Sequence, residues 1–154
     1  PQQWHSVIGT SLDGFYNVTR PLLKGMLVNR FGRIVNIVSL SGIKGLPGQA
    51  NYAAAKGGVI AATKALAQEV AKKGVTVNAI APGFFLTEQN RALLTNPDGT
   101  YTQRGQDVIR QTPFGRMGRA EELCGTIQYL ISDAASFVTG TVAVVDGGFN
   151  AFAM

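Results

Sequence analysis

A tyrosine and a lysine stand four residues apart in the stretch QANYAAAKGG, residues 49–58. Alanine has the highest helix propensity, so Tyr52 and Lys56 are expected one turn apart on the same face of a helix. A free phenol has a pKa of about 10 and is a poor base at neutral pH. A cation about 4 Å away favours the phenolate by roughly 4 kcal/mol at an effective dielectric constant of about 20. The pair can therefore donate and accept a proton when an alcohol and a carbonyl interconvert.

Taken alone, this spacing is a weak indication, because both side chains can also belong to a solvated helix face. The position of Ser39, thirteen residues before Tyr52, adds context. We expect Ser39 at the end of a buried strand over 33–39, and ligands of open parallel sheets bind outside the carboxyl ends of strands. Its hydroxyl can then donate a hydrogen bond to a substrate oxygen, although a serine that merely starts a loop is common.

A second expected strand, 75–81, ends in Pro82 and Gly83, and Thr87 follows four residues later. The carboxyl ends of parallel strands meet at one edge of the sheet, so these residues are expected near Ser39. Polar groups from several elements therefore converge on one crevice.

The elements that carry these residues alternate between helix and strand. Apolar spacing predicts a long amphipathic helix kinked at Pro21, and Gly74 should stop the helix that carries Tyr52. A turn is expected at 96–99 within the polar region 84–118. The helices are placed at 4–30, 50–73 and 119–131, and the strands at 33–39, 75–81 and 141–145. This order predicts an α/β fold with a parallel sheet covered by helices on both faces.

Composition narrows the function classes. Of the 154 residues, 45% are hydrophobic and 15% are charged, a composition that suits one domain with a buried core. The net charge is +5, and the basic residues are scattered along the chain. Nucleic-acid binding is not expected without a basic stripe, nor a membrane span without a long apolar run. The single Cys124 is expected as a small buried residue in a reducing, cytoplasmic location. With one cysteine and one histidine, His5, no metal site is expected.

Four motifs together resemble the short-chain dehydrogenase/reductase family. They are NIVSLSG, QANYAAAKGG, GVTVNAIAPG and DAASFVTGTVAVVDGG, and the resemblance covers essentially the whole chain. It implies that residues 1–154 form the C-terminal part of a doubly wound parallel-sheet (Rossmann-like) domain, with 84–118 as a substrate lid. A glycine-rich G-x-x-x-G-x-G phosphate loop does not occur after a strand. The N-terminal dinucleotide-binding half is therefore expected to be absent.

The same resemblance implies roles for individual residues. Ser39, Tyr52 and Lys56 match the catalytic serine, tyrosine and lysine, and Lys56 also bonds the nicotinamide ribose. NADP or NAD is the implied cofactor, bound by Tyr52, Lys56, Pro82, Gly83, Phe85 and Thr87. Ser11 stands where the family often has an asparagine that holds a water in a proton relay. Its shorter hydroxyl implies a weaker relay or a different water.

Two substrate classes remain open. Residues 1–83 resemble 3-oxoacyl-carrier-protein reductases, which favours reduction of a small or carrier-bound 3-oxoacyl thioester. The segment from Phe84 resembles sugar-acid oxidoreductases of the mannonate or gluconate kind. Substrate contacts are expected at Ser41, Gln49 and Arg91, and Arg91 and Arg104 can pair with a substrate carboxylate or can be solvated lid charges.

Two other classes of function stay possible: a non-catalytic cofactor-binding scaffold, and an inactive fragment whose thin sheet lacks half its strands. The resemblance further implies a homodimer or homotetramer joined through the helices 4–30 and 50–73. Their small-residue faces also suit burial against the sheet.

Overall fold

The computed structural model describes residues 1–151. Three strands form one parallel sheet in the order β1-β2-β3, which confirms the predicted α/β class. The strands are β1 Gly32–Ile37, β2 Val75–Pro82 and β3 Val142–Val145. In the register, Gly32 lies opposite Val75 and Ala79 lies opposite Val142. All three carboxyl ends therefore reach the same edge of the sheet.

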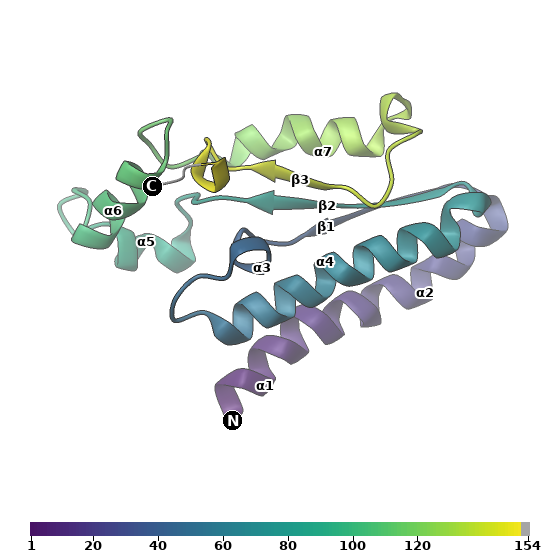
Figure 1. Ribbon diagram of the computed structural model, residues 1–154, viewed down its shortest axis with the longest axis horizontal. Coiled ribbons are helices and arrows are strands. Elements are labelled where there is room, and N and C mark those ends of the chain that lie inside the picture. Colours follow the sequence, from purple (N-terminus) through teal and green to yellow (C-terminus); the bar gives the residue numbers. More distant parts are fainter. Residues whose placement is uncertain (152–154) are drawn as a thin grey trace.

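Helices cover both faces of this sheet. Figure 1 shows α2 and α4 on one side and α7 on the other. The two long helices are α2 Gly14–Asn29 and α4 Ala50–Val70, and the shorter α1 and α7 span Gln2–Ile8 and Cys124–Ile131. After α4 a short 3₁₀ turn, Ala71–Lys73, leads to Gly74, whose φ of 75° ends the helix as predicted.

The core lies around the central strand. Every residue of β2 from Val75 to Ala81 is buried, because its apolar side chains meet helices on both faces. Thr76 and Asn78 are its two buried polar residues. Asn78 is fully buried and satisfied: its amide donates to Val138 O at 2.9 Å and its Oδ1 accepts from Thr141 N at 3.2 Å. This side chain thus ties β2 to the segment that leads into β3.

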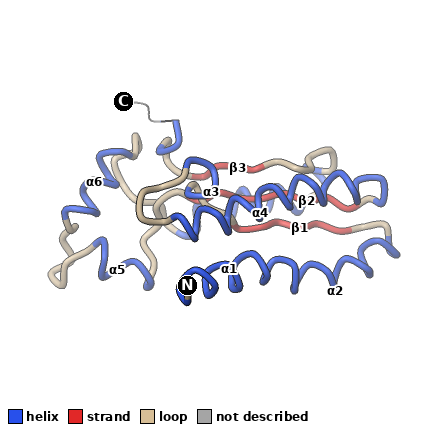
Figure 2. The backbone as a smooth tube through the Cα atoms, turned by 60° about the horizontal axis from the view of Figure 1, so that its bottom comes forward, coloured by secondary structure: helices blue, strands red, loops and turns tan. Residues whose placement is uncertain are grey.

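Three short helices gather at the carboxyl edge. They are α3 Ser41–Lys44, α5 Glu88–Leu94 and α6 Gln103–Gln111. Figure 2 shows α5 and α6 beyond the ends of the strands, where the substrate lid was expected. The predicted turn at 96–99 is confirmed, with Gly99 N donating to Asn96 O at 3.0 Å.

The first helix is less regular than its apolar spacing indicates. It is interrupted by a π-helical turn, Gly9–Asp13, and α2 continues through Pro21, where the expected kink stays a prediction. Pro21 removes one backbone donor, but it lies on an exposed face where water can bond the freed carbonyl. A π turn inserts one extra residue into the helix, which a hydrophobic spacing of three and four does not register.

Two further expectations need correction. The first strand ends at Ile37, so Ser39 lies two residues beyond it, although Val38 N still bonds Ile80 O at 2.8 Å. Cys124 is exposed rather than buried, because it opens α7, whose one fully buried residue is Leu130. Among the described helices, none is both long and apolar enough to span a membrane. Residues 1–151 also bring together no trio of histidine, cysteine or acidic side chains that suits a metal ion.

Candidate active site

Tyr52 and Lys56 lie on the first turns of α4, as their spacing predicts. Ala55 between them is fully buried, whereas Tyr52 and Lys56 are half-buried. The Lys56 ammonium nitrogen is 5.7 Å from the centroid of the Tyr52 ring. The cation therefore faces the phenol closely enough to act on its charge.

A backbone carbonyl holds the lysine in place. Lys56 Nζ donates to the carbonyl oxygen of Ile37, the last residue of β1, at 2.9 Å. Burial lowers the pKa of Lys56 below 10.5, because desolvation penalises the charged form. The bond fixes the ammonium between the strand end and the helix, where sequence spacing alone could not place it.

Six of the expected residues line one cavity of about 150 Å³ at the carboxyl edge. The lining is Ser39, Leu40, Ser41, Leu46, Gln49, Tyr52, Pro82, Gly83 and Phe84. We call this space the catalytic cavity. It joins the segment after β1, the start of α4 and the end of β2, so elements far apart in the chain meet there.

Two hydrogen bonds of Ser41 hold the loop after β1. Ser41 N donates to Ser39 Oγ at 3.2 Å, and Ser41 Oγ donates to Gln49 Oε1 at 2.5 Å. Ser41 is buried, so its hydroxyl joins the start of α3 to the residue before α4. The structure thus brings Ser41 and Gln49 to the cavity, while their contact with substrate stays a prediction.

The end of β2 forms the opposite wall. Gly83 N donates to Val145 O at 2.9 Å, which keeps this backbone paired with β3. A Cβ on Gly83 would lie 2.6 Å from the Cβ of Asp146, so a larger residue does not fit. The backbone of Pro82 and Gly83 is therefore held rigidly beside Ser39 and Tyr52.

Phe85 and Thr87 follow this wall without lining the catalytic cavity. The Phe85 ring lines a second cavity of about 100 Å³ instead. Thr87 precedes α5, and its backbone N donates to Asn90 Oδ1 at 2.8 Å. Their expected cofactor contacts stay predictions.

Three other expected residues lie outside the catalytic cavity. Arg91 on α5 is exposed and pairs with Glu88 at 3.1 Å, which fits the alternative of a solvated lid charge. Arg104 on α6 is exposed as well. Ser11 is half-buried within the π-helical turn, an irregularity often found at functional sites.

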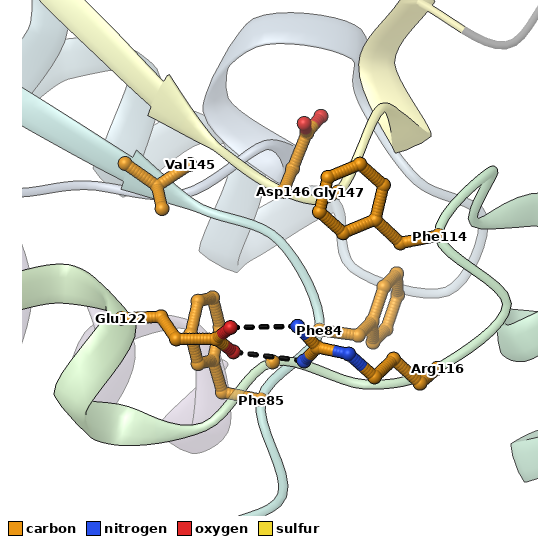
Figure 3. Close-up of a pocket in the computed structure, with 9 residues that line it drawn as sticks. Phe84, Phe85, Phe114, Arg116, Glu122, Val145, Asp146 and Gly147 are labelled. Carbon is orange, nitrogen blue, oxygen red and sulfur yellow. Dashed lines mark hydrogen bonds and ion pairs between the residues drawn. The ribbon is translucent and has the colours of Figure 1, made fainter.

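The second cavity contains an ion pair that sequence reasoning missed. Figure 3 shows the Arg116 guanidinium facing the Glu122 carboxylate across two bonds, of 2.8 and 2.6 Å. These bonds, and one from the backbone N of Arg119, lower the pKa of Glu122 to about 2. A six-residue separation in an irregular segment carries no periodic signal, so the pair could not be read from sequence.

Comparisons with known proteins identify the family of the chain. A family model described as enoyl-(acyl carrier protein) reductase matches residues 1–150. Acetoacetyl-CoA reductase of Rhizobium meliloti is 50% identical over 148 residues, which are 96% of this chain and 59% of that protein. 3-oxoacyl-[acyl-carrier-protein] reductase of Synechocystis is 43% identical over 152 residues, covering 98% and 58%.

A solved structure of a sugar-acid dehydrogenase shares the fold of this chain. A gluconate 5-dehydrogenase from Burkholderia cenocepacia, in complex with NADP and tartrate, superposes with a TM-score of 0.91 at 37% identity, covering 98% of this chain and 57% of that one. The chain thus spans less than three fifths of the length of these relatives. Together, the family match over residues 1–150, these relatives and the superposed fold show that the chain belongs to the short-chain dehydrogenase/reductase family.

Proposed function

We propose that this chain belongs to an NAD(P)-dependent oxidoreductase that interconverts a secondary alcohol and a ketone. The observation that carries the proposal is the catalytic cavity, where Ser39 and Tyr52 share one lining and Lys56 is fixed beside the phenol. A hydroxyl donor, a phenol and a cation are the groups that carbonyl reduction needs on the oxygen side. They are supplied by two separate elements at one sheet edge.

In reduction, Ser39 Oγ donates a hydrogen bond to the substrate carbonyl oxygen and holds it near Tyr52. The Tyr52 hydroxyl gives its proton to that oxygen as negative charge develops there. The Lys56 ammonium stabilises the phenolate that remains. In oxidation the same groups act in reverse, and Tyr52 takes the proton of the alcohol.

The lining also suits a nicotinamide cofactor. We place the carboxamide against the backbone at Pro82 and Gly83, which line the cavity, and the Lys56 ammonium can donate to ribose hydroxyls. Phe85 and Thr87 continue this side of the site. When bound, NAD(P) supplies or receives the hydride. The chain orients the substrate and exchanges a proton with its oxygen.

A 3-oxoacyl thioester is the substrate we favour. The support is the identity of 50% and 43% to relatives named for acetoacetyl-CoA and 3-oxoacyl carrier-protein reduction. The alternative is a sugar acid, supported by superposition on a gluconate 5-dehydrogenase at 37% identity. We place substrate contacts at Ser41 and Gln49, with residues 84–118 as the lid.

We also propose a homodimer or homotetramer that pairs α1, α2 and α4 with their copies, in the cytoplasm. Exposed Trp4, Tyr16, Val18 and Leu22 give the N-terminal helices an apolar surface for such pairing.

The test is a kinetic panel on the full-length protein. Tyr52→Phe should lower kcat for NAD(P)H-dependent reduction of an acetoacetyl thioester by roughly 10² to 10⁴-fold, because the proton donor is removed. Tyr129→Phe, an exposed tyrosine on α7 across the sheet, should leave kcat unchanged. Faster turnover of gluconate would favour the alternative substrate. Full activity in Tyr52→Phe would reject Tyr52 as the proton donor, whereas a wild-type protein that binds NAD(P)H but reduces no substrate would favour the non-catalytic scaffold.

A further inference from the structure

Three residues, Arg116–Gly118, run beside the segment that leaves β2, and we call them the strap. Gly118 N donates to Phe84 O at 2.9 Å, and Gly118 pairs with Phe85 in a parallel bridge. A Cβ on Gly118 would lie 2.4 Å from the Phe85 ring, so glycine permits the close contact. Because Phe84 lines the catalytic cavity, the strap supports one wall of that cavity from behind.

One carboxylate anchors the strap. Glu122 accepts bonds from both terminal nitrogens of Arg116, at 2.8 and 2.6 Å, and from Arg119 N at 2.8 Å. Arg116 also donates to Met117 O at 3.1 Å, within the strap itself. Paired, charge-assisted bonds of this kind are stronger and more directional than single ones. Figure 3 shows the pair beside the Phe84 and Phe85 rings.

We propose that Glu122 is a positioning residue for the cofactor side of the site. Through Arg116 it holds the strap, and the strap holds the backbone of Phe84 and Phe85 in place. Glu122 lines the second cavity and not the catalytic one, so it acts through these residues rather than on the reactants. The catalytic part of this inference rests on the proposed function.

The chain offers a matched control. Glu121 is the neighbouring carboxylate of the same 3₁₀ turn, Ala120–Leu123, and it is exposed. Glu121→Gln and Glu122→Gln therefore change the net charge equally, at adjacent positions. Only the second change removes a charge from the strap's anchor.

The experiment uses the full-length protein and three measurements: cofactor titration, steady-state kinetics and amide hydrogen exchange at Gly118. In Glu122→Gln, Kd and KM for NAD(P)H should rise roughly three- to tenfold, while exchange at Gly118 becomes faster. The value of kcat should stay within about twofold, because the proton-transfer groups are untouched. Glu121→Gln should match the wild type in all three. Simple loss of folded protein would instead lower the apparent kcat at unchanged KM.

Unchanged Gly118 exchange and unchanged cofactor affinity in Glu122→Gln would overturn the inference. If that variant folds poorly, Arg116→Lys replaces it, since lysine keeps the charge but loses the paired geometry. Failure of the proposed function gives a different result, namely a wild-type protein that neither binds nor turns over NAD(P)H. Exchange at Gly118 then still decides whether Glu122 anchors the strap.

Discussion

Gly42 should tolerate a methyl group poorly. It lies in α3, against the backbone of α4 beside Lys56. A Cβ there would lie 2.8 Å from Gly57 N and 2.8 Å from the carbonyl carbon of Lys56. Neither is a side-chain atom that can rotate away. Restoring an ordinary contact of 3.4 Å requires about 0.6 Å of separation between the two helices.

The size of the effect follows from this overlap. Overpacking typically costs about 1–3 kcal/mol, and the helix propensity of alanine returns up to about 1 kcal/mol. Gly42→Ala should therefore lower the free energy of unfolding by roughly 1–2 kcal/mol. Because Ser41 N holds Ser39 Oγ, the shift also moves Ser39 relative to Tyr52. A misplacement of about 1 Å can cost about 10²-fold, so kcat/KM should fall roughly tenfold.

The assay is urea unfolding with steady-state kinetics, and Gly25→Ala is the matched control. A Cβ on Gly25, in α2, meets nothing within 4 Å. This variant should be up to about 1 kcal/mol more stable than the wild type, with unchanged kcat/KM. If Gly42→Ala proves as stable and as active as Gly25→Ala, the close packing of α3 on α4 is not what sets the catalytic geometry.

Three further predictions concern stability. Gly74→Ala should cost more than about 1 kcal/mol in urea unfolding, because φ is 75° there and a Cβ would lie 2.3 Å from Arg30 O; an unchanged midpoint would contradict this. The folded-state pKa of Glu122 is lowered to about 2 from 4.5, so its stabilisation is complete above pH 4.5 and is lost as pH falls toward 2. The stability difference between wild type and Glu122→Gln should shrink over that window, and a constant difference would count against the ion pair. Burial lowers the pKa of Lys56, so just below pH 10.5 the folded chain binds fewer protons there than the unfolded chain. The unfolding free energy of the wild type should therefore rise with pH in that window relative to Lys56→Met, and a fall would reverse the assigned sign.

The helix that carries Tyr52 and Lys56 was predictable because its signals are local. Alanines between Tyr52 and Lys56 set the helical face, and Gly74 set the stop, so α4 appears where the sequence placed it. The carboxyl ends of parallel strands then brought Ser39 and Gly83 to the same cavity. Hydrophobic periodicity and the residues that end helices are sufficient to predict elements of this kind.

Contacts between distant segments were not predictable. The hydrogen bond from Lys56 to Ile37 O joins residues nineteen apart, and no pattern in the sequence predicts it. The Arg116–Glu122 pair and the close approach at Gly42 likewise depend on how irregular segments pack. Cys124 was misjudged because apolar neighbours along the chain do not show which face of a short helix meets the sheet.

The most direct test of proton transfer at Tyr52 is the pH dependence of kcat/KM for alcohol oxidation in wild type, Lys56→Met and Lys56→Arg. A unit charge 5.7 Å from the ring contributes up to roughly 3 kcal/mol at an effective dielectric constant of about 20, and solvent screening reduces this. The rise of the Lys56→Met profile should therefore move to higher pH, whereas Lys56→Arg should keep it near the wild-type position. Profiles that rise at the same pH in all three proteins would contradict the role of the Lys56 ammonium in activating Tyr52.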